Sequence, residues 1–363
     1  MTVNISRSIK AQKGEKMHVL VTGNNGYIGT VMVPMLLAQG FEVTGLDSDL
    51  YEGCNFGDAS VSGAISDITY LRKDIRDVQI SDLKGIDAVA HLCALSNDPL
   101  GNLNPKITYE INYEGSVRLA KMARKAGVER YILSSSCSVY GATTADTVDE
   151  ESEVRPVTPY AESKVLAERD ISKLANSKFT PVFLRSSTAY GLSPMLRFDL
   201  VVNNFVAWSF TKGTVLLKSD GSAWRPFVHI QDISRAFITA LRAPRDLVHN
   251  QVFNVGKNEE NYRIRQVAEI VKQTVSGSQI KYVEGAEADK RSYKVEFNKI
   301  AEALPEFKPQ WTVPMGAKQL YEAYKKVGLL VEEFEGPRYR RITHLENSLR
   351  SGRVDNTMRR VYN

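Results

Sequence analysis

The sequence predicts an α/β protein in which a doubly wound parallel sheet is joined to a smaller, mixed α/β C-terminal lobe. Three observations support this fold class. Apolar runs of strand length alternate with helical periodicity, a glycine-rich turn follows the first run, and the alternation becomes irregular after Gly191. Strands that alternate with helices form βαβ units with right-handed crossovers, which place helices on both faces of a parallel sheet.

Seven apolar runs have the length of buried strands, and helical periodicity separates several of them. The strand-like runs are 17–21, 41–46, 69–72, 87–92, 130–134, 181–184 and 251–255. The clearest helical segments are 27–39, 105–126, 160–176 and 230–241. Gly40 is a stop signal for the first helix, because glycine readily adopts the left-handed conformation that ends helices.

A chain of 363 residues is too long for one small core and suits two domains or one large α/β unit. Proline, glycine and charged residues become more frequent where the alternation is irregular, which favours a lobe built from segments that leave the sheet and return. The predicted organisation is a disordered leader at 1–16, a main domain at 17–191 with 230–255 returning to it, a smaller lobe at 192–229 and 256–330, and an Arg-rich tail at 331–363.

The formal net charge of +5 belongs to the C-terminal tail, since residues 336–363 hold seven arginines and two acids and leave the rest neutral. A neutral body argues against a nucleic-acid partner. No apolar stretch approaches the roughly 20 residues that span a bilayer, and residues 1–16 lack a signal-peptide core. Three cysteines without metal-ligand spacing and five dispersed histidines favour a cytoplasmic protein without a metal site.

The turn at 22–29 reads Thr-Gly-Asn-Asn-Gly-Tyr-Ile-Gly and lies between the first strand and the first helix. In this context Gly23 permits a tight turn, Gly26 lets the backbone approach a pyrophosphate, and Gly29 lets the helix pack closely on the strand. The helix N-terminus attracts the phosphates. The main domain is therefore predicted to be a Rossmann domain that binds a dinucleotide.

Asp47 ends the second strand, 24 residues after Gly23. A carboxylate there accepts a hydrogen bond from a ribose 2′-hydroxyl and repels a 2′-phosphate, so the predicted cofactor is NAD rather than NADP.

Tyr160 and Lys164 are four residues apart in a helical segment and therefore share one face. A phenol is a poor base at neutral pH, but a nearby ammonium lowers its pKa. Tyr160 can then remove a hydroxyl proton while a hydride leaves the same carbon. Ser136 lies at the carboxyl end of a predicted strand, where ligands bind in this architecture, and can hydrogen-bond the reacting oxygen.

These residues together resemble the NAD-dependent epimerase/dehydratase family of nucleotide-sugar enzymes, the extended short-chain dehydrogenases. The resemblance covers about 17–326. It is carried by an ordered set of motifs: Thr22-Gly-x-x-Gly-x-x-Gly29, Asp47, Lys73-Asp-Ile-Arg-Asp77, His91-Leu-Cys-Ala-Leu95, Asn112, Ser136 before Val139-Tyr-Gly141, Tyr160-x-x-x-Lys164 and Arg225-Pro-Phe-Val-His-Ile-Gln-Asp232.

The resemblance implies roles for individual residues and a homodimer formed through the helices at 105–126 and 160–176. The implied catalytic residues are Ser136, Tyr160 and Lys164. The implied NAD-binding residues are Gly23, Gly26, Tyr27, Ile28, Gly29, Asp47, Asp74, Ile75, Leu92, Ala94, Leu95, Asn112, Ser134, Tyr160 and Lys164. The implied ligands of a nucleotide-diphosphate sugar are Ser96, Ser136, Cys137, Arg197, Arg225 and Arg291.

The residues before Val139 narrow the reaction. By the same resemblance, 4,6-dehydratases carry Asp-Glu there and decarboxylating relatives keep a Glu, whereas this chain has Cys137-Ser138. Relatives that epimerise C3 and C5 use a Cys at the position of Ser138, one residue later than the Cys found here. Because side chains alternate along a strand, Cys137 as an acid/base is the minority hypothesis.

The remaining chemistry needs a hydride and one proton. We therefore expect C4 epimerisation of a nucleotide sugar through a transient 4-keto intermediate. A 4-dehydrogenase or 4-keto reductase is the alternative, and a non-catalytic dinucleotide-sensing or RNA-associated relative is a more remote one. The sequence leaves open which nucleotide and sugar are bound. It also leaves open whether the tail covers the smaller lobe, contacts a dimer partner or is disordered.

Overall fold

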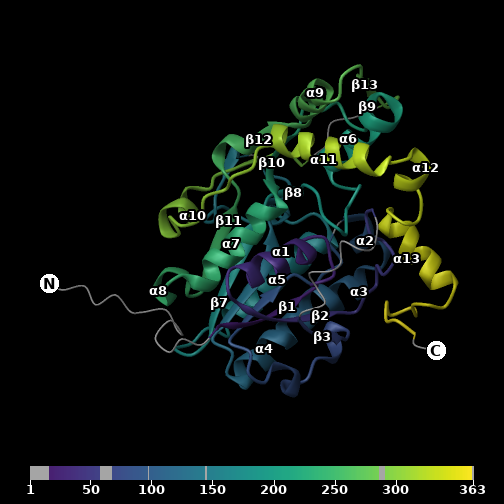
Figure 1. Ribbon diagram of the computed structural model, residues 1–363. Coiled ribbons are helices and arrows are strands. Elements are labelled where there is room, and N and C mark those ends of the chain that lie inside the picture. Colours follow the sequence, from purple (N-terminus) through teal and green to yellow (C-terminus); the bar gives the residue numbers. More distant parts are fainter. Residues whose placement is uncertain (1–15, 58–67, 97, 144, 286–290, 362–363) are drawn as a thin grey trace.

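The computed structural model describes residues 16–57, 68–96, 98–143, 145–285 and 291–361. The leader predicted for 1–16 therefore lies outside the described residues, apart from Lys16. A seven-stranded sheet has the order β11-β7-β5-β4-β1-β2-β3, and every neighbouring pair is parallel (Figure 1). Its strands are β1 (His18–Thr22), β2 (Glu42–Asp47), β3 (Thr69–Arg72), β4 (Ala88–His91), β5 (Arg130–Ser136), β7 (Thr180–Ser186) and β11 (Gln251–Val255). The predicted doubly wound fold is confirmed.

Side-chain alternation explains why helices cover both faces of this sheet. Val19 and Val21 of β1 pack into one apolar cluster, and Leu20 between them packs into another on the opposite face. The first cluster includes side chains of α1 (Gly29–Ala38) and α7 (Ile230–Arg242). The second includes α4 (Ser116–Ala126) and α5 (Pro159–Ser172). Both faces are therefore buried, as a parallel sheet requires.

The helix predicted at 105–126 is interrupted by a π-helical segment. It consists of α3 (Pro105–Tyr109), the π-helix η4 (Glu110–Gly115) and then α4. Such segments occur often at functional sites, because the wider turn redirects side chains. Here the segment carries Asn112, which is fully buried.

The smaller lobe has its own apolar cluster, beyond the carboxyl ends of the strands (Figure 1). Its strands are β8 (Thr188–Tyr190), β9 (Thr214–Leu217), β10 (Trp224–His229), β12 (Asn261–Arg263) and β13 (Gln279–Tyr282). Its longer helices are α6 (Val201–Lys212), α9 (Ile264–Thr274) and α11 (Val313–Val327). The short elements β6 (Thr147–Val148), α8 (Arg245–Val248), β14 (Lys294–Val295) and α10 (Asn298–Ala303) lie beside the sheet, and α2 (Asp98–Leu103) precedes α3.

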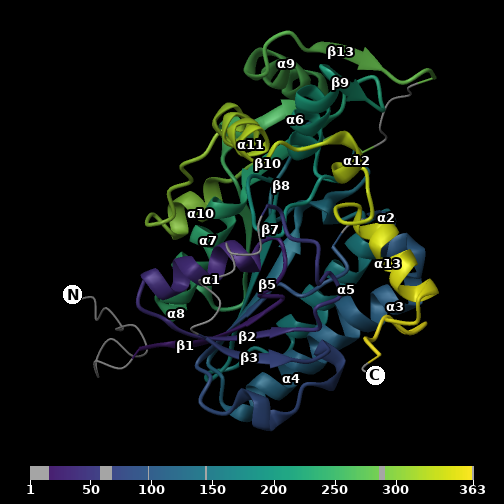
Figure 2. The same cartoon turned by 45° about the vertical axis from the view of Figure 1, so that its right-hand side comes forward.

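The C-terminal tail, residues 331–363, is folded over its described part and crosses from one lobe to the other (Figure 2). In α12 (Val331–Phe334), Phe334 packs into the cluster of the smaller lobe. In α13 (Arg341–Arg350), Leu345 packs into a cluster of the main domain. Arg360 forms an ion pair with Glu52 at 2.5 Å, so part of the tail's positive charge is neutralised by the main domain.

Within the described residues, no helix combines the length and the apolar character needed to cross a bilayer.

Candidate active site

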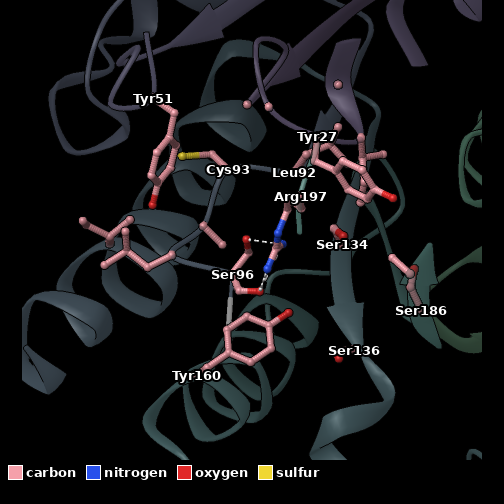
Figure 3. A pocket seen from close by; sticks show the side chains of 18 of the residues that line it. Tyr27, Tyr51, Leu92, Cys93, Ser96, Ser134, Ser136, Tyr160, Ser186 and Arg197 are labelled. Carbon is pink, nitrogen blue, oxygen red and sulfur yellow. Dashed lines mark hydrogen bonds between the residues drawn. The ribbon is translucent and has the colours of Figure 1, made fainter. Parts of the chain in front are cut away.

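A cleft at the carboxyl edge of the sheet separates the main domain from the smaller lobe (Figure 3). From β1 the chain first adds strands on one side of the sheet (β2 and β3) and then on the other side (β4, β5, β7 and β11). Ligands bind at the point where the direction of strand addition switches, which here is beside β1. Most of the site residues expected from the sequence line this cleft. They are Gly23, Gly26, Tyr27, Ile28, Gly29, Asp47, Asp74, Ile75, Leu92, Ala94, Leu95, Ser96, Ser134, Ser136, Tyr160, Lys164 and Arg197.

The glycine-rich turn is packed too closely for side chains. Gly23 has a φ of +75°, which L-residues rarely adopt. A Cβ on Gly29 would lie 2.2 Å from the carbonyl oxygen of Gly23, so a larger residue there would push α1 off the turn. This close packing directs the N-terminus of α1 at the cleft, where it can receive a pyrophosphate.

Asp47 ends β2, and its carboxylate accepts hydrogen bonds from the backbone N–H groups of Asn25 at 3.1 Å and Asp49 at 2.9 Å. Burial raises the pKa of Asp47 to about 6, so the carboxyl is ionised at neutral pH. Two residues after the neighbouring strand β3, burial opposes ionisation of Asp74, but hydrogen bonds from Arg76 hold its pKa below the ordinary value. Two carboxylates beside a glycine turn fit the hydroxyl and amino donors of an adenosine.

The helix α5 presents Tyr160 and Lys164 to the same cleft. In Figure 3 Tyr160 extends into the cavity towards Ser96 and Arg197. The Lys164 ammonium lies 5.8 Å from the Tyr160 ring centroid and donates a hydrogen bond to the carbonyl of Ser134 at 2.8 Å. Burial lowers the pKa of Lys164 to about 8. A desolvated ammonium beside a phenol is the arrangement that favours a phenolate.

A buried polar network behind the cleft fixes α5 against the sheet, and sequence reasoning missed it. Glu168 accepts a hydrogen bond from Ser135 and pairs with Arg185 of β7 at 2.7 Å. Arg185 also donates to the hydroxyl of Tyr140 at 3.2 Å. The sequence did offer a signal for this network, because Glu168 follows Lys164 by four residues and therefore lies on the same helix face.

Ser136 lies at the end of β5 and lines the cleft. Its hydroxyl accepts a hydrogen bond from the backbone N–H of Ser138 at 3.2 Å. The expected contact between Cys137 and the substrate is not supported, because Cys137 lies outside the cleft lining and is 2% exposed. Its thiol faces the Arg185 carbonyl at 3.2 Å, and burial raises its pKa to about 12. A thiol in this environment is a core group rather than an acid/base.

Asn112, expected to bind the cofactor, does not line the cleft either. Its side-chain oxygen accepts from the backbone N–H of Leu95 at 2.8 Å, and its amide donates to the Leu95 carbonyl at 3.0 Å. The π-helical segment thereby holds the loop after β4. Asn112 positions cleft residues without facing the cleft.

The three arginines expected to contact the substrate are divided between two cavities. Arg197 reaches from the smaller lobe into the main cleft, where it pairs with Asp199 at 2.6 Å and donates to the Ser96 hydroxyl at 2.9 Å (Figure 3). Arg225 and Arg291 instead line a second cavity in the smaller lobe, together with Arg340 and Arg341. Arg225 donates to the Arg291 carbonyl, which joins two segments distant in sequence.

Sequence reasoning missed several cleft residues. Tyr51 follows β2, Ser186 and Ser187 lie at the end of β7, and Arg341 comes from the tail. The end of a predicted strand could have indicated Ser186. Nothing in the composition of the tail distinguishes Arg341 from its neighbours. Among the described residues, no group of three or more His, Cys, Asp or Glu could hold a metal ion.

Comparison with known proteins agrees with this geometry. The profile of the NAD dependent epimerase/dehydratase family matches residues 19–256. UDP-glucose 4-epimerase of Halalkalibacterium halodurans is 30% identical over 71% of this chain and 80% of its own length. The complex of MoeE5 with UDP-glucose and NAD superimposes with a TM-score of 0.72 at 26% identity, covering 85% of this chain and 99% of that one. DesIV, a dTDP-glucose 4,6-dehydratase from Streptomyces venezuelae with NAD and TYD bound, gives 0.75 at 25% identity, covering 89% and 100%.

Proposed function

The chain belongs to the NAD-dependent epimerase/dehydratase family, and we propose that it inverts C4 of a nucleotide sugar through a transient 4-keto intermediate. One observation carries this proposal. Tyr160 and Lys164 share a cleft with the glycine-rich turn, and the carboxylates among its described lining residues are Asp47 and Asp74, both on the side of β2 and β3. The catalytic end thus offers a phenol and an ammonium, which suit hydride chemistry better than elimination.

NAD is the cofactor of this family, and bound NAD accepts a hydride from a sugar carbon and can return it. The N-terminus of α1 would hold the pyrophosphate, and Asp47 would accept from the adenosine ribose. These residues fit the group, because the turn has no room for side chains and the carboxylate already faces the cleft.

The chain's own residues move the proton. Tyr160 takes the proton of the 4-hydroxyl while the C–H electrons leave as hydride, which produces the 4-keto sugar. Lys164 stabilises the phenolate by its charge. Ser136 donates a hydrogen bond to the reacting oxygen. The keto sugar then rotates so that the opposite face of C4 meets the hydride. Tyr160 returns the proton to the oxygen as the hydride returns to C4, so the product has the same atomic composition as the substrate.

The substrate class follows from the relatives and from the second cavity. The relatives include a UDP-glucose 4-epimerase and a structure with UDP-glucose bound. Arg225 and Arg291 in the second cavity, with Arg197 beside it, would hold the diphosphate of a nucleotide sugar, for which the guanidinium fork is suited. Dehydratase relatives match the same fold. Here Cys137 and Ser138 replace the acid pair that the family resemblance assigns to dehydration.

The test is to incubate the protein with NAD and UDP-glucose in D2O and to analyse products by mass spectrometry and proton NMR. We expect UDP-galactose of unchanged mass with no deuterium bound to carbon, because the hydride returns internally. Deuterium at C3 or C5 would indicate a different epimerisation. UDP-glucuronate is the second substrate to try, since the nucleotide and sugar contacts come from the irregular lobe.

Two outcomes overturn the proposal. A product lighter by two hydrogens with accumulating NADH identifies a dehydrogenase, and a product lighter by one water identifies a dehydratase. The variant Tyr160→Phe is the matched control, because it keeps the aromatic ring and removes only the hydroxyl that exchanges the proton.

A further inference from the structure

We propose that Arg341, in the C-terminal tail, binds a diphosphate at the place where the main cleft meets the second cavity. This inference rests on the proposed function only in assigning NAD to the main cleft and a nucleotide sugar to the second cavity. It adds a ligand-binding role for a segment, residues 331–363, that the family resemblance did not reach.

The position of Arg341 is the first observation. It begins α13 and lines both cavities, as no other arginine among the described residues does. Its guanidinium lies 4.4 Å from the ring centroid of Tyr51, a residue of the loop after β2 that also lines the cleft. The residue is 7% exposed. Arg341 is therefore held inside the molecule rather than on the solvated surface of the tail.

The hydrogen bonds of Arg341 are incomplete. A guanidinium has five N–H donors. Within the described residues it makes one weak hydrogen bond, from Nη2 to the Met195 carbonyl at 3.4 Å, and its buried Nε has no partner. Buried donors without acceptors are costly, and they are rare unless a ligand or water completes them.

The charge of Arg341 is compensated only at a distance, by Asp199. The neighbouring Arg197 is neutralised by Asp199 at 2.6 Å, whereas no carboxylate among the described residues forms an ion pair with Arg341. Burial, followed by the charge of Arg197, lowers the pKa of Arg341. A buried cation without an ion-paired carboxylate destabilises the fold, so this place favours a bound anion.

The surroundings indicate which anion it is. On one side lie Gly26 and Tyr27 of the phosphate turn, and on the other lie Arg225 and Arg291. A diphosphate is the anion that both cavities are built to receive, and Arg binds it through paired N–H donors. Two sources share this chemistry: the pyrophosphate of NAD and the diphosphate of the nucleotide sugar.

The experiment measures ligand affinity by calorimetry on full-length protein freed of NAD, comparing wild type with Arg341→Gln. One titration uses NAD. The other uses inorganic pyrophosphate in the presence of saturating NAD, which leaves the substrate position as its site. We expect the variant to weaken one of the two by about tenfold to a hundredfold, the size of a lost charged hydrogen bond. The affected titration identifies the source.

The control is Arg350→Gln, at the exposed end of the same helix, where the side chain is 74% exposed. It should bind both probes like the wild type. The proposal is overturned if Arg341→Gln binds NAD as tightly as the wild type does and the pyrophosphate titration shows no effect of the variant either. That second condition is met if pyrophosphate binds the variant and the wild type equally well, or if it fails to bind the wild type. Neither titration depends on turnover, so a failed epimerase assay would not affect this result.

Thermal unfolding separates a ligand-binding role from a structural one. Arg341→Met keeps the long side chain over Tyr51 and removes the unpaired charge, so the ligand-free variant should melt at or above the wild-type temperature. Saturating ligand should then stabilise the wild type more than the variant, because tighter binding raises apparent stability. A variant that is less stable without ligand and stabilised by ligand as much as wild type would identify a structural role only.

Discussion

The main cleft and the second cavity differ in how the chain supplies their side chains. In the cleft, Asp47 and Ser136 lie at strand ends, and Tyr160 and Lys164 follow one helix face. In the second cavity, Arg225 lies on β10 and Arg291 in a loop more than sixty residues later, joined by a hydrogen bond between separate segments. Regular elements thus carry the residues proposed for the chemistry, whereas one of the two arginines proposed to bind the substrate comes from an irregular loop.

The largest expected effect comes from removing the hydroxyl that exchanges the proton in the cleft while leaving the cofactor site intact. Tyr160→Phe should lower kcat by about 100- to 10,000-fold, the range of general acid–base catalysis, because no hydroxyl remains to exchange the proton. NAD affinity and melting temperature should stay near wild type. Steady-state kinetics and a NAD titration check this. Equal loss of turnover and NAD affinity would mean that Tyr160 mainly binds the cofactor.

The next effect tests whether the cleft depends on the network behind it. Glu168→Ala leaves the buried Arg185 charge unpaired, so the free energy of unfolding should fall by about 3–5 kcal/mol. Denaturant titration measures it. The matched control is Glu153→Ala, whose partner Arg155 lies at 2.7 Å but on the surface, where solvent screens the pair and the loss should be far smaller. Similar losses at both sites would contradict a special role for the buried pair.

A smaller effect tests the second cavity. Arg225→Gln and Arg291→Gln should each raise KM for the nucleotide sugar by about tenfold to a hundredfold, since each would remove a charged hydrogen bond. NAD affinity should not change, because neither residue lines the main cleft. The control is Arg242→Gln, at the C-terminal end of α7, where Arg242 donates a hydrogen bond to the Gln39 carbonyl at 2.7 Å. Weaker NAD binding by Arg225→Gln or Arg291→Gln would contradict the assignment of NAD to the main cleft and of the nucleotide sugar to the second cavity.

At about pH 9, one unit above the pKa of Lys164, the effect of pH on the cleft is the smallest of those expected. Burial lowers the pKa of Lys164 to about 8, and a lysine is charged below its pKa. The stabilisation of the Tyr160 phenolate is therefore present below about pH 8 and is lost as the pH rises through that value. We expect kcat to fall by up to about tenfold for each pH unit above this point. A flat profile to pH 10 would show that the ammonium is not required.

Periodicity predicted the sheet because both faces of each central strand are buried, as Val19, Leu20 and Val21 illustrate. The cleft residues were predictable where a motif ends a strand or begins a helix. The structure does not bring Cys137 to the cleft, since the chain turns into a 3-10 helix (η5, Cys137–Tyr140) directly after Ser136. That turn directs the thiol into the core. The homodimer stays a prediction.

Asn112 and Arg341 show two further limits of the sequence. Motif position alone did not distinguish a residue that holds a cleft loop, as Asn112 does, from one that meets the ligand. The tail was unpredictable for a different reason, because its apolar anchors Phe334 and Leu345 pack against different lobes and form no single periodic stripe. Only the folded arrangement reveals which of its arginines is buried.

The path of the tail across both lobes has a kinetic consequence. Phe334 is anchored in the smaller lobe and Leu345 in the main domain, so the lobes cannot separate widely unless one of these contacts is released first. That release adds a barrier to the escape of a molecule held between them. A reaction that regenerates its own oxidant has no need to exchange it between cycles, and a long residence time for NAD suits such a cycle.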